Sequence, residues 1–129
     1  WDKRGLESVH MRILSCAQVT SARALGTWLS YDDLIQLTKR CIDTPVTGFT
    51  VVYGVSNNDR AAVDNSKASF IGFRPKDNAE QFAEKILAET DVLDSQDPGH
   101  MCHGGPFAKV DLGESGLATM TIIDDKKVI

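Results

Sequence analysis

The sequence predicts an α/β fold in which parallel strands are flanked by helices. Two short runs of strand-forming residues lie in the first half of the chain, and a segment with helical periodicity separates them. Strands joined through a helix normally pair in parallel within one sheet. In a chain of 129 residues, we expect this arrangement over residues 1–90, followed by an irregular tail with a possible strand or hairpin over residues 91–129.

The first strand is predicted from alternation. Residues 9–13 alternate between apolar and polar side chains, which is the period-2 pattern of a strand. Residues 15–26 show no convincing period, so we expect a loop there. Loops that follow buried strands commonly carry binding residues.

A helix is predicted to begin at Ser30 and to end before Pro45. The Ser30 hydroxyl is a good cap, and Asp32 and Asp33 stand at the positive end of the helix dipole. Paired carboxylates could alternatively serve acid/base chemistry, but at a helix start the dipole role is the ordinary one. The apolar side of this helix is formed by Leu34, Ile35, Leu37, Cys41 and Ile42.

A second strand and two further helices are predicted downstream. Residues 49–55 form an apolar run almost without polar alternation, which is typical of a strand covered on both faces. Residues 64–66 offer caps for a short helix that Gly72 would terminate. Asp77, with Glu80 three positions later, predicts the start of an amphipathic helix. Residues 117–123 have the pattern of a final strand.

Composition excludes several classes of protein. The net charge is −4 and the pI is near 5.2, and Lys and Arg form no cluster, so we expect no nucleic-acid partner. No apolar run approaches the roughly 20 residues of a membrane span. Three widely spaced cysteines, Cys16, Cys41 and Cys102, indicate thiols in a reducing cytoplasm. The chain opens at Trp1 without an initiating Met, which suggests a piece of a longer protein.

Three phrases of the sequence resemble the uronate dehydrogenases, which are NAD-dependent members of the extended short-chain dehydrogenase family. They are RILSC at residues 12–16, TWLSYDDL at 27–34 and VVYGVSNN at 51–58, in matching order and with matching gaps. The phrases DNS, GFRPKDNAE and HGGPF continue the similarity, so that it covers roughly residues 1–108. The resemblance implies that residues 1–90 are the C-terminal part of an NAD(P)-binding Rossmann-like domain, with its substrate-side loop and helices.

The resemblance implies roles for three residues. Ser15 would form a hydrogen bond with a sugar acid, and Arg23, four residues before Thr27, would bind the carboxylate of that acid. A guanidinium presents a planar fork that matches a carboxylate with two hydrogen bonds. The backbone near Ile13 would touch the nicotinamide of NAD. From chemistry alone, Arg23 could equally be a solvated loop charge and Ser15 a turn residue.

The sequence departs from the family pattern at three places. Leu14 stands where the family usually has Gly, which adds bulk near the expected ligands. The 16–22 segment is one residue shorter than usual and lacks prolines. Residues 61–63 are Ala-Ala-Val where relatives carry a pair of tryptophans, so a large apolar contact is lost.

The parts that perform catalysis in this family are missing from the sequence. No glycine-rich turn with the spacing for a dinucleotide pyrophosphate occurs between a predicted strand and helix. The family's Tyr-x-x-x-Lys pair is absent too, because Tyr31 is followed four positions later by Ile35, and Tyr53 by Asn57. We therefore expect no catalytic residue and no hydride transfer by this chain alone.

Two other groups of reactive side chains are weak candidates for a functional site. His100, Cys102 and His103 include metal-ligand types, but no fourth ligand lies at suitable spacing, and we expect a packed polar tail and no metal site. Cys16 and His10 could suggest a thiol nucleophile, but six strand residues span about 20 Å.

In the complete protein, the resemblance implies NAD-dependent oxidation of a hexuronate, such as galacturonate or glucuronate, to the aldarolactone. This chain would supply the substrate-binding part. One alternative is a sugar-nucleotide epimerase or dehydratase of the same superfamily, and another is a truncated binding or assembly module without catalysis. An incomplete sheet should expose an edge and an apolar face, so we expect self-association or a missing N-terminal segment.

Overall fold

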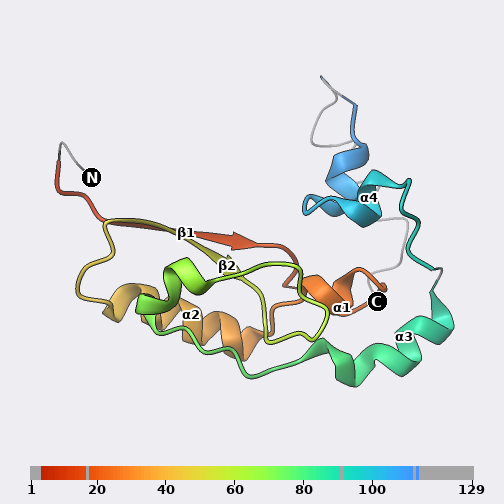
Figure 1. Ribbon diagram of the computed structural model, residues 1–129, viewed down its shortest axis with the longest axis horizontal. Coiled ribbons are helices and arrows are strands. Elements are labelled where there is room, and N and C mark those ends of the chain that lie inside the picture. Colours follow the sequence, from red (N-terminus) through yellow and green to blue (C-terminus); the bar gives the residue numbers. More distant parts are fainter. Residues whose placement is uncertain (1–3, 17, 91, 112, 114–129) are drawn as a thin grey trace. The chain divides into compact units, whose positions relative to one another are not determined.

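The computed structural model describes residues 4–16, 18–90, 92–111 and 113. The chain divides into two compact units, Trp1–Asp91 and Val92–Ile129, which are described separately (Figure 1). The strand predicted over residues 117–123 lies outside the described residues.

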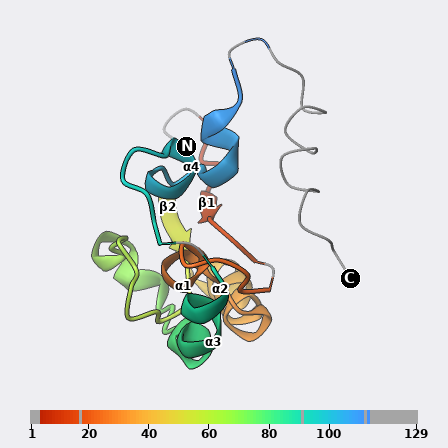
Figure 2. The ribbon, with the colours of Figure 1, turned by 90° about the vertical axis from the view of Figure 1, so that its right-hand side faces the viewer.

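The first unit contains a parallel pair of strands. Strand β1, Ser8–Ile13, pairs with β2, Phe49–Gly54, and the register runs from Ser8 opposite Phe49 to Ile13 opposite Gly54. Helix α2, Tyr31–Asp43, connects them and lies on one side of both strands (Figures 1 and 2). Both predicted strands and their parallel pairing are confirmed.

Helix α2 begins where the sequence predicts. The Ser30 Oγ accepts a hydrogen bond of 3.0 Å from the backbone N–H of Asp33 and caps the helix. Leu37 on its inner side is fully buried. Ile35 and Ile42, which were predicted to extend this apolar side, are instead 53% and 76% exposed. The buried stripe of α2 is therefore narrower than the sequence suggests.

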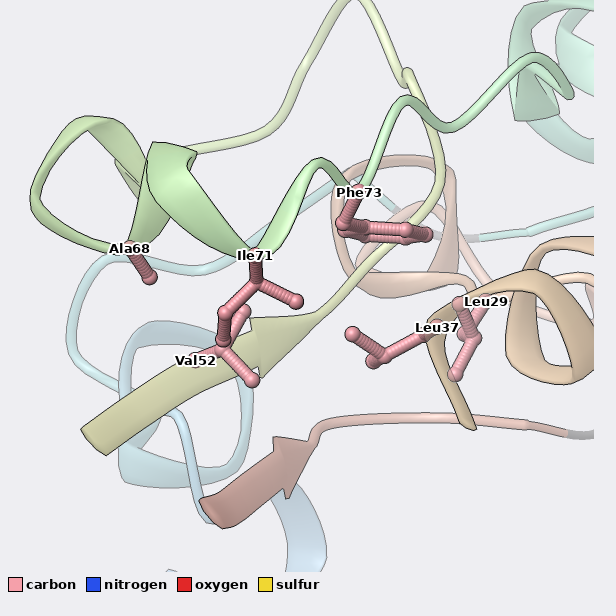
Figure 3. Packing of buried hydrophobic residues seen from close by; sticks show 6 residues of the cluster. All are labelled: Leu29, Leu37, Val52, Ala68, Ile71 and Phe73. Carbon is pink, nitrogen blue, oxygen red and sulfur yellow. The ribbon is translucent and has the colours of Figure 1, made fainter. Parts of the chain in front are cut away.

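A hydrophobic cluster fills the space between α2, β2 and the 3₁₀ helix η1, Ser66–Ile71 (Figure 3). Gly72 ends η1 in the left-handed conformation, with φ of 77°, as predicted for its terminator. The cluster is formed by Leu29, Leu37, Val52, Ala68, Ile71 and Phe73.

The prediction that β2 is covered on both faces is wrong. Thr50, Val52 and Gly54 are buried, whereas Phe49 is 64% and Val51 is 44% exposed. Burial alternates because the described elements packed on the strands, α2 and η1, cover the Val52 face. The strand β2 therefore carries apolar side chains that this unit leaves exposed.

A second cluster joins the loop after β1 to the last helices of the unit. The predicted loop contains a short helix α1, Ala24–Thr27, whose Leu25 is fully buried. It packs with the 3₁₀ helix η2, Ala79–Phe82, and with α3, Ala83–Glu89. The cap of η2 is Asn78 and not the predicted Asp77: the Asn78 Oδ1 accepts a 2.9 Å hydrogen bond from the Glu80 N–H.

The second unit has two short helices where an irregular tail was expected. They are α4, Pro98–Met101, and η3, Gly105–Lys109. Asp97 caps α4 through the Gly99 N–H at 2.8 Å and receives a 2.5 Å hydrogen bond from the Lys109 Nζ. Across the ranges that the structure describes, every helix is too short or too polar to cross a lipid bilayer.

Candidate functional site

The segment between β1 and α2 crosses the ends of both strands. Ser15 forms an isolated parallel bridge with Trp28, and its carbonyl accepts a 2.8 Å hydrogen bond from the Leu29 N–H. The Trp28 carbonyl in turn accepts hydrogen bonds from the Ser56 N–H at 2.9 Å and the Asn58 Nδ2 at 2.8 Å. The segment is thus fixed at the carboxyl ends of two parallel strands, where open α/β sheets commonly bind ligands.

The two predicted substrate ligands both lie in this segment. Ser15 is partly buried directly after β1. Arg23 is partly buried at the start of α1, where its carbonyl accepts a hydrogen bond from the Thr27 Oγ1 at 3.3 Å. This partial burial desolvates the Arg23 guanidinium and lowers its pKa. Their roles as sugar-acid ligands stay predictions.

Ile13, the predicted nicotinamide contact, ends β1 with 42% of its surface exposed. It packs against Gly54, where an added Cβ would stand 2.9 Å from the Ile13 Cγ1 and 3.1 Å from the Leu29 Cδ2. Gly54 is therefore required for the close approach of the two strand ends.

Asp33 has a structural role that the sequence did not reveal. Its side chain is nearly fully buried, and its Oδ2 accepts hydrogen bonds from the Ser56 Oγ at 2.6 Å and from the Asp77 N–H at 3.1 Å. Its Oδ1 accepts a third, of 2.9 Å, from the Lys76 N–H. Asp32 remains exposed in the first turn, so the dipole role predicted for the pair describes Asp32 better than Asp33.

Ser56 and Asn58 complete the support of the segment. The Ser56 Oγ accepts from the Ser30 N–H at 2.9 Å while it donates to Asp33. The Asn58 Oδ1 accepts from the Ala79 N–H at 2.9 Å, and its amide nitrogen donates to Trp28. Together they join the segment that carries Ser15 and Arg23 to α2 and to η2. Both lie in the third phrase of the family resemblance, but nothing in the sequence alone showed their partners.

Gly26 brings α1 against the main chain of Arg60. A Cβ at Gly26 would lie 2.5 Å from the Arg60 carbonyl oxygen. Arg60 is itself held by two hydrogen bonds to Glu80, of 2.8 and 2.7 Å. These bonds raise the pKa of Arg60 and lower that of Glu80, because each charge stabilises the other.

Replacing Gly26 by alanine is expected to lower the free energy of unfolding by about 1–3 kcal/mol, the usual cost of overpacking. Alanine gains at most about 1 kcal/mol in helix propensity, which does not offset a clash with a backbone carbonyl. Urea unfolding followed by circular dichroism measures the change. Gly104→Ala is the control, because its added Cβ would meet no atom closer than 3.8 Å. Equal midpoints for the two variants would contradict the contact.

A depression of about 320 Å³ lies beside the loop after β2. The small side chains of Ala61 and Val63 border it, at the place where the sequence departs from the family's tryptophans. Asn65 also lines it, but its amide is committed to the Tyr53 main chain, with hydrogen bonds of 2.8 Å to the N–H and the carbonyl. The Asn65 side chain in this lining therefore serves the fold.

The strand ends do not fit the phosphates of a dinucleotide. β1 runs into Leu14 and Ser15, and β2 runs into Val55 and Ser56, so neither is followed by a glycine-rich turn that exposes backbone N–H groups at a helix start. The contact of Ile13 with a nicotinamide ring stays a prediction.

No metal centre is found within the described ranges, where no three His, Cys, Asp or Glu side chains gather. The His100 Nδ1 accepts a 3.0 Å hydrogen bond from the Asp94 N–H, and its Nε2 lies 3.9 Å from the Asp97 Oδ2. Burial raises the pKa of the Cys16 thiol, which opposes a role as a nucleophile.

Comparison with known proteins shows similarity to uronate dehydrogenases. The chain is 42% identical over 109 residues to the uronate dehydrogenase of Pseudomonas putida, which covers 84% of this chain and 40% of the relative. The crystal structure of a glucuronic acid dehydrogenase from Chromohalobacter salexigens superposes with a TM-score of 0.76 at 39% identity, over 81% of this chain and 40% of that one. The crystal structure of a mutant uronate dehydrogenase from Agrobacterium tumefaciens, complexed with NAD, superposes with a TM-score of 0.80 at 38% identity. This superposition covers 88% of this chain and 43% of that one. No protein-family model matches the chain.

The chain thus spans about two fifths of the length of the relatives it matches. The predicted resemblance to uronate dehydrogenases is confirmed for this part of their length. The predicted fold class, α/β with parallel strands and flanking helices in part of a Rossmann-like fold, is confirmed as well.

Proposed function

We propose that this chain supplies the sugar-acid-binding part of an NAD-dependent uronate dehydrogenase, an oxidoreductase that converts a hexuronate to its aldarolactone. The observation that carries the proposal is the 42% identity to the Pseudomonas putida enzyme over 109 residues. The segment with Ser15 and Arg23 supports it, because hydrogen bonds fix this segment at the carboxyl ends of β1 and β2.

In this proposal, Arg23 binds the carboxylate of the sugar acid and Ser15 donates to one of its oxygens. Arg23 is already partly desolvated, so an anion beside it is attracted more strongly than it would be in water. The guanidinium fork then fixes the orientation of the carboxylate as well as its position. Both residues follow β1 in the segment whose Trp28 carbonyl accepts the Asn58 and Ser56 hydrogen bonds described above.

NAD accepts a hydride in such an oxidation, but the described residues do not fit its phosphates. We therefore propose Ile13 as a contact at the nicotinamide edge and assign no catalytic residue to this chain. The three cysteines form no disulfide, which supports a reducing compartment such as the cytoplasm.

Thermal unfolding with galacturonate tests the proposal. At a concentration tenfold above its Kd, a single bound ligand stabilises the fold by about 1.4 kcal/mol, which raises the Tm by about 5 °C. Arg23→Ala is expected to abolish the shift, because charge-assisted hydrogen bonds worth about 1.5–3 kcal/mol are lost. The Tm of each variant without ligand reports whether it folds.

Two controls make this test specific. Arg40→Ala removes the same charge from the exposed side of α2 and should keep the full shift. Galactose, which has the ring without the carboxylate, should give no shift. A chain that melts cooperatively but shows no shift with galacturonate or glucuronate would overturn the proposal, and equal shifts for Arg23→Ala and Arg40→Ala would overturn the role of Arg23.

A further inference from the structure

Arg23 lies at the start of α1, a helix too short to be stable by itself. The helix has four residues, Ala24–Thr27, and isolated helices shorter than about 12 residues are marginal in water. Its position is therefore imposed by the elements packed around it. The Arg23 carbonyl accepts a 3.1 Å hydrogen bond from the Gly26 N–H, so a contact that fixes Gly26 also fixes the main chain of Arg23.

A turn at residues 59 and 60 lies directly against Gly26. An added Cβ at Gly26 would stand 2.5 Å from the Arg60 carbonyl oxygen and 3.2 Å from the Arg60 carbonyl carbon. Surfaces packed this closely transmit small displacements from one main chain to the other. The position of the Arg60 main chain thus helps to determine where Gly26 lies.

Side chains tie this turn to η2. The Arg60 guanidinium donates to the Glu80 carboxylate twice, from Nε to Oε2 at 2.8 Å and from Nη2 to Oε1 at 2.7 Å. The Asn78 Nδ2 donates to the Asp59 Oδ1 at 2.8 Å. Two parallel bonds between a guanidinium and a carboxylate fix orientation as well as distance. The turn therefore has a defined position relative to η2.

Two other contacts hold α1, and the turn adds a third. Burial of Leu25 in the second cluster holds the helix against η2 and α3. The Asn58 bond to the Trp28 carbonyl holds the residue that follows the helix. The contact at Gly26 supports α1 at a further point, on the residue that bonds to Arg23. Three points of support define the orientation of the helix.

We infer that the Arg60–Glu80 ion pair positions Arg23 to bind the carboxylate of the sugar acid. Arg60 and Glu80 are positioning residues, which act through the main chain of Gly26. The identity of the ligand rests on the proposed function, whereas the packing of α1 needs no ligand. Without the ion pair, α1 adopts further orientations, and the apparent Kd rises as the fraction with a correctly oriented Arg23 falls.

Removing the two charges separately distinguishes positioning from a direct charge effect. Arg60→Gln and Glu80→Gln are each expected to raise the Kd for galacturonate about threefold, the scale of an exposed ion pair. Electrostatics alone would give opposite results, because Arg60 attracts the carboxylate of the ligand and Glu80 repels it. NMR titration with galacturonate measures the Kd of each variant at a temperature where it is fully folded.

A measurement without ligand reports on α1 directly. The Gly26 amide, which donates to Arg23, should exchange its hydrogen about threefold faster in both variants, since opening of α1 costs less free energy. The Leu34 amide of α2, which donates to the Ser30 carbonyl at 2.9 Å, should be unchanged. A general loss of stability would accelerate both amides.

Glu84→Gln is the matched control. It removes an exposed carboxylate one turn after Glu80, in the first turn of α3, and should change neither the Kd nor the exchange at Gly26. Opposite effects of Arg60→Gln and Glu80→Gln on the Kd, or unchanged exchange at Gly26 in both, would overturn the inference. Failure of the proposed function looks different: the unchanged chain would not bind galacturonate. That result would remove the ligand named here, while the exchange at Gly26 would still decide whether the ion pair fixes α1.

Discussion

Replacing Asp33 by alanine is expected to lower the free energy of unfolding by about 3–5 kcal/mol. The change leaves the Ser56 hydroxyl and the N–H groups of Lys76 and Asp77 without their acceptor, and each buried unsatisfied group costs about 1–3 kcal/mol. Two of the three donors are partly buried, so water recovers part of the loss. Urea unfolding measured by circular dichroism gives the difference between the midpoints.

Asp32→Ala is the matched control for that measurement. It removes an exposed carboxylate from the same helical turn, where its interaction with the dipole is worth about 0.3–1 kcal/mol. A loss at Asp33 no larger than the loss at Asp32 would show that the buried carboxylate does not anchor the 76–77 segment.

Leu37→Ala is expected to cost about 2–5 kcal/mol, because a fully buried side chain is lost from the cluster between α2 and β2. Ile35→Ala, two residues away and 53% exposed, should change stability by less than about 1 kcal/mol. Denaturant unfolding of both variants compares the loss of stability at the buried side of α2 with the loss at its exposed side. A similar cost for both would mean that Ile35 is buried in solution, for instance by association of the chain.

The strands and α2 could be predicted because their signals are local. Alternation marks β1, and Ser30 with the following carboxylates marks the start of α2. The exposure of one face of β2 could not be predicted. An apolar sequence indicates that both faces of a strand can be buried, but it does not show which elements pack on them. Phe49 is the clearest case, at 64% exposure.

The site was predictable only in outline. Resemblance placed Ser15 and Arg23 in one segment, and the structure shows how that segment is fixed. Asp33 escaped prediction because two of its three donors are main-chain groups more than 40 residues away and the third, the Ser56 hydroxyl, is 23 residues away. At the next helix the predicted cap is wrong by one residue: Asn78 caps η2, while the preceding Asp77 donates its N–H to Asp33.

The Trp28 carbonyl limits how a ligand can be recognised at this segment. A carbonyl oxygen has two lone pairs, and here both are occupied, by the Ser56 N–H and the Asn58 amide. A sugar hydroxyl therefore finds no spare acceptor at that peptide group. In the proposed function, discrimination between sugars at this point therefore falls to the side chains of Ser15 and Arg23, and replacing either side chain is expected to change substrate preference while the hydrogen bonds to the Trp28 carbonyl remain.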